Sequence, residues 1–198
     1  RGGHGASPHL TVDPVIAAAQ VVTALQTITS RNVAPLQAAV VSVTSVHSGT
    51  TFNVIPQTAE LTGTIRTFDP DVRTLVLERF DRIVRGLAET LGCEAGLEVL
   101  RVTPAVVNNE AIARTVQGAA QRVLPTPDLD TAPYLTMGAE DMAFMQEKVP
   151  GCYFFVGSNN RERHLDYGHH HPRFDFDEEA LPRAAALMTA AVIDVLNA

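Results

Sequence analysis

The stretch AELTGTIRTFDPDVRTLVLERF, residues 59–80, decides how the first half of the chain folds. Its first part, residues 59–67, alternates strictly: Leu61, Gly63 and Ile65 fall on one face, and polar residues fall on the other. This period of two is typical of a half-buried strand. The rest of the stretch has an apolar residue at every third or fourth position, which predicts an amphipathic helix.

Two helices of the first half are predicted to begin with the same dipeptide. Asp13-Pro14 and Asp69-Pro70 each place an aspartate at the N-cap and a proline at the first helical position. Gly92 can end the second of these helices, because glycine readily adopts the left-handed conformation found after a helix.

Strands are predicted around these helices at 38–46, 59–67 and 97–102. The order is therefore helix, strand, strand, helix, strand. One more strand before Arg1 would complete a split βαβ sandwich, with two helices on one face of an antiparallel sheet. The chain opens on a glycine-rich turn without an initiator methionine, so we expect it to be a fragment.

The second half has a different pattern of apolar residues. Residues 152–156, CYFFV, form a continuous apolar run, which is typical of a strand buried on both faces. Helices are predicted at about 109–124 and, capped by Asp177, at the C-terminus. The predicted domains are 1–105 and 106–198. The apolar stripe of the C-terminal helix is predicted to consist of Leu181, Ala184, Met188, Val192 and Val195.

Composition excludes several classes of protein. Of 198 residues, 45% are hydrophobic and 19% charged, which predicts packed domains rather than disorder. A net charge of -7 disfavours nucleic acid as a partner. No run has the ~20 apolar residues of a membrane span, and no signal peptide is seen. Cys93 and Cys152 lie outside any CxxC pair, so reduced, partly buried thiols and a cytoplasmic location are expected.

Three residues of the first half could carry chemistry, although for each a plainer role fits the pattern better. His4 lies between glycines that would leave its imidazole exposed, or it is a loop histidine without function. Asn53 is a turn residue or an amide aimed at a substrate. Arg66 is a solvated charge at the end of a strand, or a fork for a carboxylate.

The sharpest local feature is the run His169-His170-His171-Pro172. Three consecutive histidines cannot all face the same way, so one or two of them could reach a metal. A metal site needs three or four ligands from distinct elements, and the chain has no HExxH or CxxC motif. The spacing leaves one ligand or none as equal alternatives and argues against a complete site. Glu140-Asp141 opens a short helix, where acidic residues are favourable for the helix dipole alone.

Five stretches occur in an order that resembles one known family. They are RGGHGASPHLTVDPV, FNVIPQTAELTGTIRTFD, MGAEDMAF, VPGCYFFVG and HHHPRFDFDEEALP. Together they resemble the dinuclear-metal amidohydrolases and peptidases, which include aminoacylases, carboxypeptidase G2 and succinyl-diaminopimelate desuccinylase. The residues of these stretches are most similar to those of hippurate hydrolases, N-acyl-L-amino acid amidohydrolases and plant auxin-conjugate hydrolases.

The resemblance implies an α/β fold in which a smaller lid interrupts a metal-binding catalytic domain. Residues 1–105 would be the lid, of the ferredoxin-like split βαβ type, and would form a homodimer. Residues 106–198 would be the C-terminal segment of the catalytic domain.

The resemblance also implies roles for single residues. His4 would be catalytic, binding the scissile carbonyl oxygen, in dimeric members from the partner subunit. Asn53 and Arg66 would hold the polar end of the substrate. His170 would bind metal, and Gly138 would lie at the substrate, in a loop near the metal pocket. His169 and His171 receive no role.

The implied cofactor is a pair of divalent ions of zinc, cobalt, manganese or nickel. The other metal ligands of the family and its glutamate general base have no counterpart in this sequence. We therefore expect a parent protein that hydrolyses the amide bond of hippurate-like N-acyl amino acids, and a chain that is inactive by itself. Two alternatives stay open: an inactive dimerisation module, and a non-catalytic binding protein that uses the Arg66 face.

Overall fold

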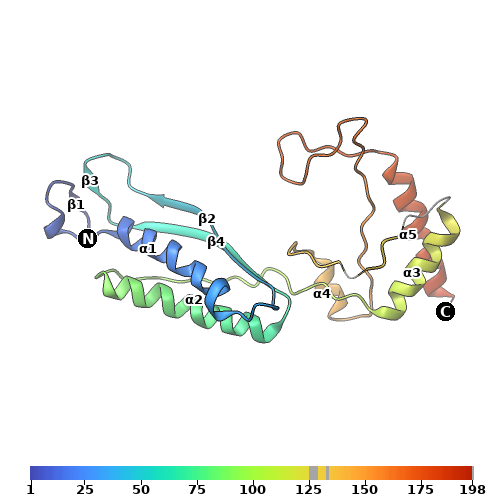
Figure 1. Cartoon of the computed structure of the whole chain (residues 1–198), viewed down its shortest axis with the longest axis horizontal. Coiled ribbons are helices and arrows are strands. Elements are labelled where there is room, and N and C mark those ends of the chain that lie inside the picture. The colour runs from blue at the N-terminus through green and yellow to red at the C-terminus, as the bar shows by residue number, and fades with distance from the viewer. Residues whose placement is uncertain (125–128, 133, 198) are drawn as a thin grey trace. The chain divides into compact units, whose positions relative to one another are not determined.

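The computed structural model describes residues 1–124, 129–132 and 134–197 (Figure 1). The chain divides into two compact units, Arg1–Arg101 and Val102–Ala198. In the described part of the chain, no helix is both long and apolar enough to cross a bilayer.

The first unit is built on an antiparallel pair of strands, β2 (Ala39–Ser48) and β4 (Ala59–Thr67). The bounds of β4 are those of the alternating stretch, so the predicted strand is confirmed. The register places Val41 opposite Ile65. A bulge at Thr44 adds one residue to β2, and each strand has one edge unpaired among the described residues.

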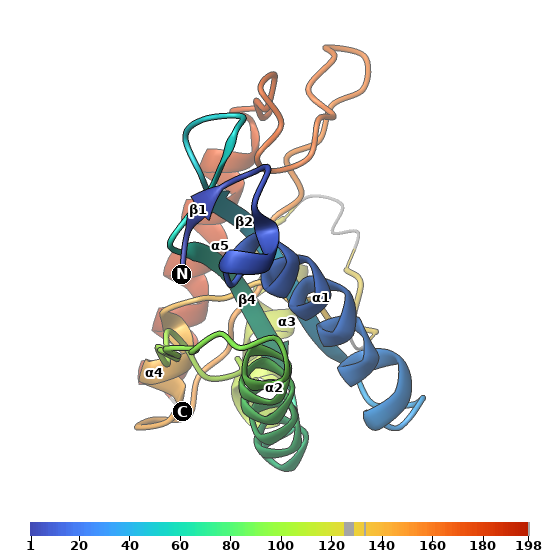
Figure 2. The same cartoon turned by 90° about the vertical axis from the view of Figure 1, so that its left-hand side faces the viewer.

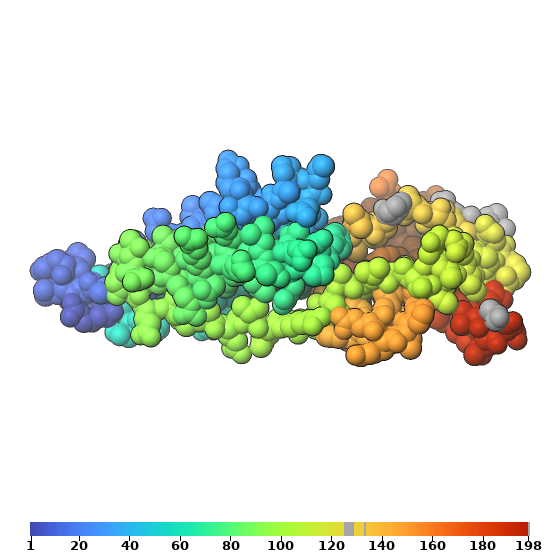
Figure 3. All heavy atoms as spheres, turned by 90° about the horizontal axis from the view of Figure 1, so that it is seen from below, coloured from blue at the N-terminus to red at the C-terminus, as the bar shows by residue number. Residues whose placement is uncertain are grey.

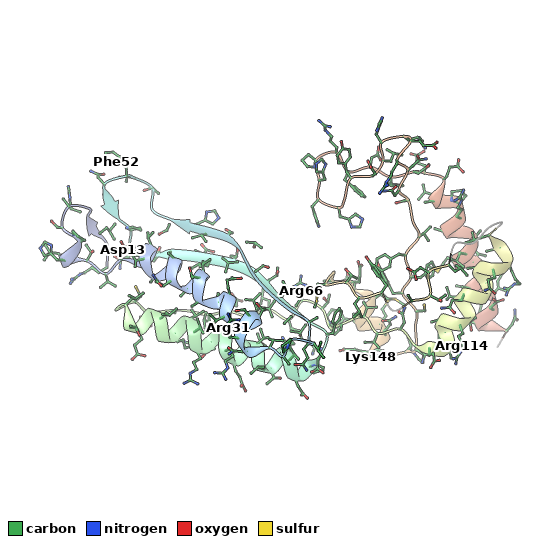
Figure 4. The ribbon with its side chains drawn as sticks, in the orientation of Figure 1. Asp13, Arg31, Phe52, Arg66, Arg114 and Lys148 are labelled. Atoms are coloured by element: carbon green, nitrogen blue, oxygen red, sulfur yellow. The ribbon has the colours of Figure 1, made fainter. Side chains whose placement is uncertain are left out.

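The helices α1 (Pro14–Thr27) and α2 (Pro70–Thr90) begin where the two Asp-Pro pairs predict. Asp13 and Asp69 each accept a hydrogen bond from the backbone N–H two residues further on, at 2.8 and 2.7 Å. These bonds satisfy donors that have no partner inside the helix. Asp13 is seen at the start of α1 in Figure 4. Gly92 follows α2 with a φ of 72°, the left-handed conformation predicted for it.

Both helices pack on the same face of the sheet, as predicted (Figures 1 and 2). Seen from below, α2 lies beside α1 along this unit (Figure 3). Leu25, Ile28 and Val76 are its most deeply buried large side chains. The buried core consists of Val21, Leu25, Ile28, Val33, Val41, Val72, Val76 and Val84.

Short elements complete this unit. A two-residue strand, β1 (Gly3–His4), pairs antiparallel with β3 (Val54–Ile55) and forms a second small sheet. A 3-10 turn follows β1 at Pro8–Leu10, and a π-helical turn continues α1 at Ile28–Asn32.

The predicted strand at 97–102 is wrong. This segment has no strand partner among the described residues. The residues just before this segment lie against α2 and not at a sheet edge. The contact is a hydrogen bond from the Arg85 guanidinium to the Ala95 carbonyl oxygen, at 3.4 Å. Ala95 and Leu97 still pack against the core of this unit.

The second unit contains α3 (Glu110–Val123), α4 (Met142–Gln146) and α5 (Ala180–Leu196). Asn109 caps α3 with its side chain, which agrees with the predicted start of this helix. The helices α3 and α5 pack together, and Arg122 of α3 binds both carboxylate oxygens of Asp194 of α5 at 2.6 and 2.7 Å. Their shared core consists of Val116, Ala119, Ala120, Leu187 and Ala191.

Two predictions for α5 are wrong. The N-cap position is Glu179 rather than Asp177, and its side chain makes no capping bond. The stripe predicted to be buried is mostly exposed, with Met188 at 54% and Val192 at 48%. The helix is apolar over most of its circumference, so its periodicity could not identify the face that packs on α3.

The run 152–156 is not a strand in this structure, contrary to prediction. The side-chain amide of Asn108 occupies the place of a neighbouring strand: its nitrogen donates to the Tyr153 carbonyl oxygen, and its oxygen accepts from the Tyr153 N–H, both at 2.7 Å. The run is therefore hydrogen-bonded at Tyr153 without belonging to a ladder of strands.

Candidate functional site

The structure brings His4 and Asn53 together at one end of the first unit. Pairing of β1 with β3 places His4 opposite Val54. The N–H of Gly5 donates to the carbonyl oxygen of Asn53 at 2.8 Å. Glycine suits this position, because a Cβ on Gly5 would lie only 3.0 Å from that oxygen. Two residues almost fifty positions apart are thus adjacent in space.

His4 and Asn53 both present hydrogen-bond donors. The exposed His4 ring accepts at Nδ1 from the Ala6 N–H, at 3.0 Å. In the neutral ring the proton is then on Nε2, which has no partner among the described residues. The Asn53 side-chain oxygen accepts from the Thr51 hydroxyl at 2.9 Å, which leaves the amide nitrogen to donate. Each of these N–H donors suits a carbonyl oxygen or a carboxylate.

Arg66 lies elsewhere in the same unit. It is opposite Val40 near the end of β4, on the face away from the helices, and is partly buried (Figure 4). Its guanidinium donates to the Ile65 carbonyl oxygen at 3.1 Å and has no carboxylate partner among the described residues. Arg66 is seven residues along β4 from Ala59, the end that meets the Asn53 loop, or roughly 20 Å. Within one copy of the chain, Arg66 is therefore too far from His4 and Asn53 to share a small ligand with them.

The three consecutive histidines have different surroundings. His171 stacks on Tyr167, with ring centroids 4.4 Å apart and planes inclined by 9°. His169 meets Phe174 edge to face, with centroids 5.0 Å apart. His170 is exposed, has a left-handed φ of 66°, and has no partner among the described residues. Packing thus leaves His170 as the imidazole that is available for a ligand.

Asp177 accepts hydrogen bonds at the base of the loop that carries these histidines. The donors are Asn160 Nδ2 at 2.5 Å, Arg163 Nη1 at 2.8 Å and the Glu179 N–H at 3.2 Å. The hydrogen bond from Asn160, then the bond from the Glu179 N–H and the positive charges of Arg163 and Arg183, lower the pKa of the Asp177 carboxyl. Its stabilising effect is therefore complete above about pH 4 and is lost as the pH falls through the lowered pKa.

Gly138 lies in an exposed loop, and its N–H donates to the Thr136 hydroxyl at 3.3 Å. The short helix predicted after Glu140-Asp141 is confirmed as α4. Burial, and then a hydrogen bond with the Glu140 carboxylate, raise the pKa of Tyr153. This loop therefore lies against the run 152–156.

The described residues do not complete a metal site. No three of their histidine, cysteine, aspartate and glutamate side chains lie close enough together to hold an ion. The role of His170 as a ligand of such a site stays a prediction. Both cysteines are free and partly buried, as expected, and burial raises the pKa of the Cys152 thiol.

Sequence reasoning missed the residues that fix the histidine loop. Asn160, Arg163 and Tyr167 make the contacts described above, yet none of them falls in a motif or a period. The one local signal was the composition of residues 157–160, GSNN, which is typical of a turn.

Residues 4–194 match the family described as Peptidase family M20/M25/M40. The chain belongs to this family. N-acetylcysteine deacetylase of Bacillus subtilis is 38% identical over 198 residues, covering 100% of this chain and 50% of that protein. Thermostable carboxypeptidase 2 of Saccharolobus solfataricus is 36% identical, covering 100% and 49%. The chain spans about half the length of the curated relatives it matches.

The fold of the M20/M25/M40 member agrees with that of solved relatives. A Bacillus subtilis structure, described as a dinuclear metal binding peptidase from the M20 family, superposes with a TM-score of 0.66 at 34% identity. It covers 93% of this chain and 46% of that one. The predicted α/β class is confirmed. The named M20/M25/M40 relatives do not single out the hippurate hydrolase subgroup.

Proposed function

We propose that the complete protein containing this chain is a metal-dependent amidohydrolase that cleaves the amide bond of N-acyl amino acids of the hippurate-like class. The observation that carries this proposal is the family match over residues 4–194. The names of two relatives support the substrate class. N-acetylcysteine and the C-terminal end of a peptide share one chemical feature, an acylated amine on an amino acid with a free carboxylate.

His4 is the proposed oxyanion donor. Its Nε2–H is free among the described residues, and the neighbouring Gly5 is bonded to the Asn53 backbone. Donors placed where negative charge develops on a carbonyl oxygen stabilise the transition state more than the bound substrate. This role needs an N–H on the exposed side of the ring, which the bond from Ala6 to Nδ1 supplies.

His170 is the proposed metal ligand, and Gly138 is proposed to line the substrate site. Support for a metal comes from the solved relative described as dinuclear, with zinc, cobalt, manganese and nickel as candidates. Divalent ions in such sites polarise a carbonyl and lower the pKa of bound water. The described residues of this chain offer one proposed ligand and not the full set.

We propose that the first unit is a lid through which the protein dimerises. The roughly 20 Å along β4 between Arg66 and the Asn53 end of the unit is much longer than an N-acyl amino acid. Residues of two copies can serve one substrate if His4 and Asn53 come from one lid and Arg66 from the other. The unpaired edges of β2 and β4 offer hydrogen bonds for such an association.

Self-association can be measured on this chain by light scattering. We expect a mass of twice 21.3 kDa at high protein concentration, since sheet edges tend to pair with one another. Dilution should shift the mass toward the monomer. A mass of one chain at every concentration would contradict the dimer proposal without affecting the proposed reaction.

Arg66 tests the proposed substrate class. Arg66→Ala in the complete protein should raise KM for an N-acyl amino acid by about tenfold to a hundredfold, because a charged hydrogen bond contributes about 1.5–3 kcal/mol. The turnover number should change much less, since this contact exists before and during the reaction. The measurement is steady-state kinetics with added zinc, cobalt or manganese.

The matched substrate for this experiment is the same compound with its carboxylate replaced by a carboxamide. Its kinetics should be nearly the same in the parent protein and in Arg66→Ala. An equal loss for both substrates would show that Arg66 does not bind the carboxylate. No hydrolysis of any N-acyl amino acid by the complete protein would favour a binding module.

A further inference from the structure

The loop that carries His170 is closed at its base by Asp177, which forms hydrogen bonds with both its backbone and its side chain. The backbone N–H of Asp177 donates to the Ser158 carbonyl oxygen at 2.9 Å. Its carboxylate receives Asn160 Nδ2 on one oxygen and Arg163 Nη1 on the other, at 2.5 and 2.8 Å. We call this arrangement of Ser158, Asn160, Arg163 and Asp177 the Asp177 clamp.

Asn160 is the central partner of the clamp. Its backbone pairs with Leu165 in both directions, at 2.9 and 3.0 Å, which closes a tight turn. Its side-chain oxygen accepts from the Arg163 N–H at 3.2 Å, and its side-chain nitrogen reaches Asp177. The Asp177 side chain is 14% exposed, so this contact is largely protected from water.

The far end of the loop is held by rings rather than by regular structure. Tyr167 stacks on His171, and the Arg173 guanidinium donates to the Tyr167 hydroxyl at 3.2 Å. The Arg173 N–H donates to His171 Nδ1 at 3.1 Å. These contacts fix the neighbours of His170 relative to the loop, and the clamp fixes the loop relative to α5.

We propose that Asp177 is a positioning residue, which holds the loop through Asn160 and Arg163 so that His170 keeps its place. This inference rests on the proposed role of His170 as a metal ligand. The loop has no helix and only one isolated backbone bridge between residues 158 and 177. The place of His170 therefore depends on side-chain contacts, and the clamp is the set of contacts at the base.

The sharpest test exchanges the two partners of the shortest bond. Asp177→Asn puts two amide nitrogens face to face, and Asn160→Asp puts two carboxylates face to face. The double variant, Asn160→Asp with Asp177→Asn, restores one donor and one acceptor and keeps an oxygen for Arg163. Glu178→Gln is the matched control, because Glu178 is exposed and its side chain has no partner among the described residues.

Each single variant of the complete protein should bind Zn²⁺ about tenfold more weakly, the lower end of the range for residues that orient metal ligands. The turnover number should recover at saturating Zn²⁺ with KM unchanged. Hydrogen exchange at the Leu165 and Asp177 amides should become faster. The exchanged pair should return both the Zn²⁺ affinity and the amide protection most of the way to the parent values.

The clamp is overturned if Asp177→Asn matches Glu178→Gln in Zn²⁺ affinity, or if the exchanged pair is no better than the single variants. His170→Ala separates this proposal from the proposed function. Unchanged Zn²⁺ affinity in His170→Ala would refute the ligand role of His170. Loss of Zn²⁺ in His170→Ala, with parent-like affinity in Asp177→Asn, would refute the clamp and leave the ligand role intact.

Discussion

Replacing His4 with alanine should lower the turnover number of the complete protein by about 10² to 10³, with KM changed little. The Nε2–H of His4 is proposed to act on the oxygen where charge develops, and such a donor contributes mainly in the transition state. Metal content should stay the same, because His4 is assigned to the substrate. Steady-state kinetics with an N-acyl amino acid measures the effect.

His9→Ala is the control for His4→Ala. His9 is an exposed histidine in the 3-10 turn just after β1, and no contact of its side chain is seen in the described structure. Its loss should leave turnover nearly unchanged. If the lid reaches the partner subunit, mixing His4→Ala with His170→Ala should restore part of the activity. Near-normal turnover in His4→Ala would return His4 to a loop histidine without function.

Leu25→Ala should lower the free energy of unfolding of the first unit by about 2–5 kcal/mol. Leu25 is 2% exposed and lies in the cluster where α1, α2 and β2 meet. The alanine would leave a cavity that helices fixed by their caps cannot easily close. Urea denaturation of this chain, followed by circular dichroism, measures the loss.

Leu36→Ala makes the same chemical change without the cavity. Leu36 is 101% exposed, and surface substitutions usually change stability by less than about 0.5 kcal/mol. Equal losses in the two variants would show that Leu25 is not in a packed core. The pair thus tests the buried face that the alternation in β4 and the helix periods predict.

The parts of the fold that could be predicted are those whose signal is local. Asp13 and Asp69 bond to N–H groups two residues away, so their effect is contained in a few letters of sequence. The alternation over 59–67 is equally local, and it predicted both the bounds of β4 and the face that α1 and α2 cover. The start of α3 at Asn109 has the same kind of signal.

The parts that could not be predicted depend on partners distant in the sequence. Apolar character at 97–102 and 152–156 is compatible with a strand, but a strand also needs a neighbour to share hydrogen bonds. Asp177 has the chemistry of a helix cap and accepts from the Glu179 N–H, but it shares its carboxylate with Asn160 and Arg163, and α5 begins only at Ala180. Capping propensity has no information about such competition.

The candidate site divides in the same way. Single residues could be named from motifs, but the approach of the Asn53 backbone to the His4 segment and the distance to Arg66 follow from the register of two small sheets. The sequence alone does not distinguish the three consecutive histidines from one another. They differ because Tyr167 and Phe174 pack against two of the rings, whereas the His170 ring has no such contact among the described residues.

The amide of Asn108 determines on which side the run 152–156 could pair with another strand. In an extended chain, the N–H and C=O of one residue point to the same side, and those of its neighbours point to the other. Asn108 occupies the N–H and C=O of Tyr153, so a strand that joins the run on its other side would bond to Cys152, Phe154 and Val156. At Tyr153 the run can therefore pair with a strand on one side only, because Asn108 already uses the hydrogen-bonding groups on the other side.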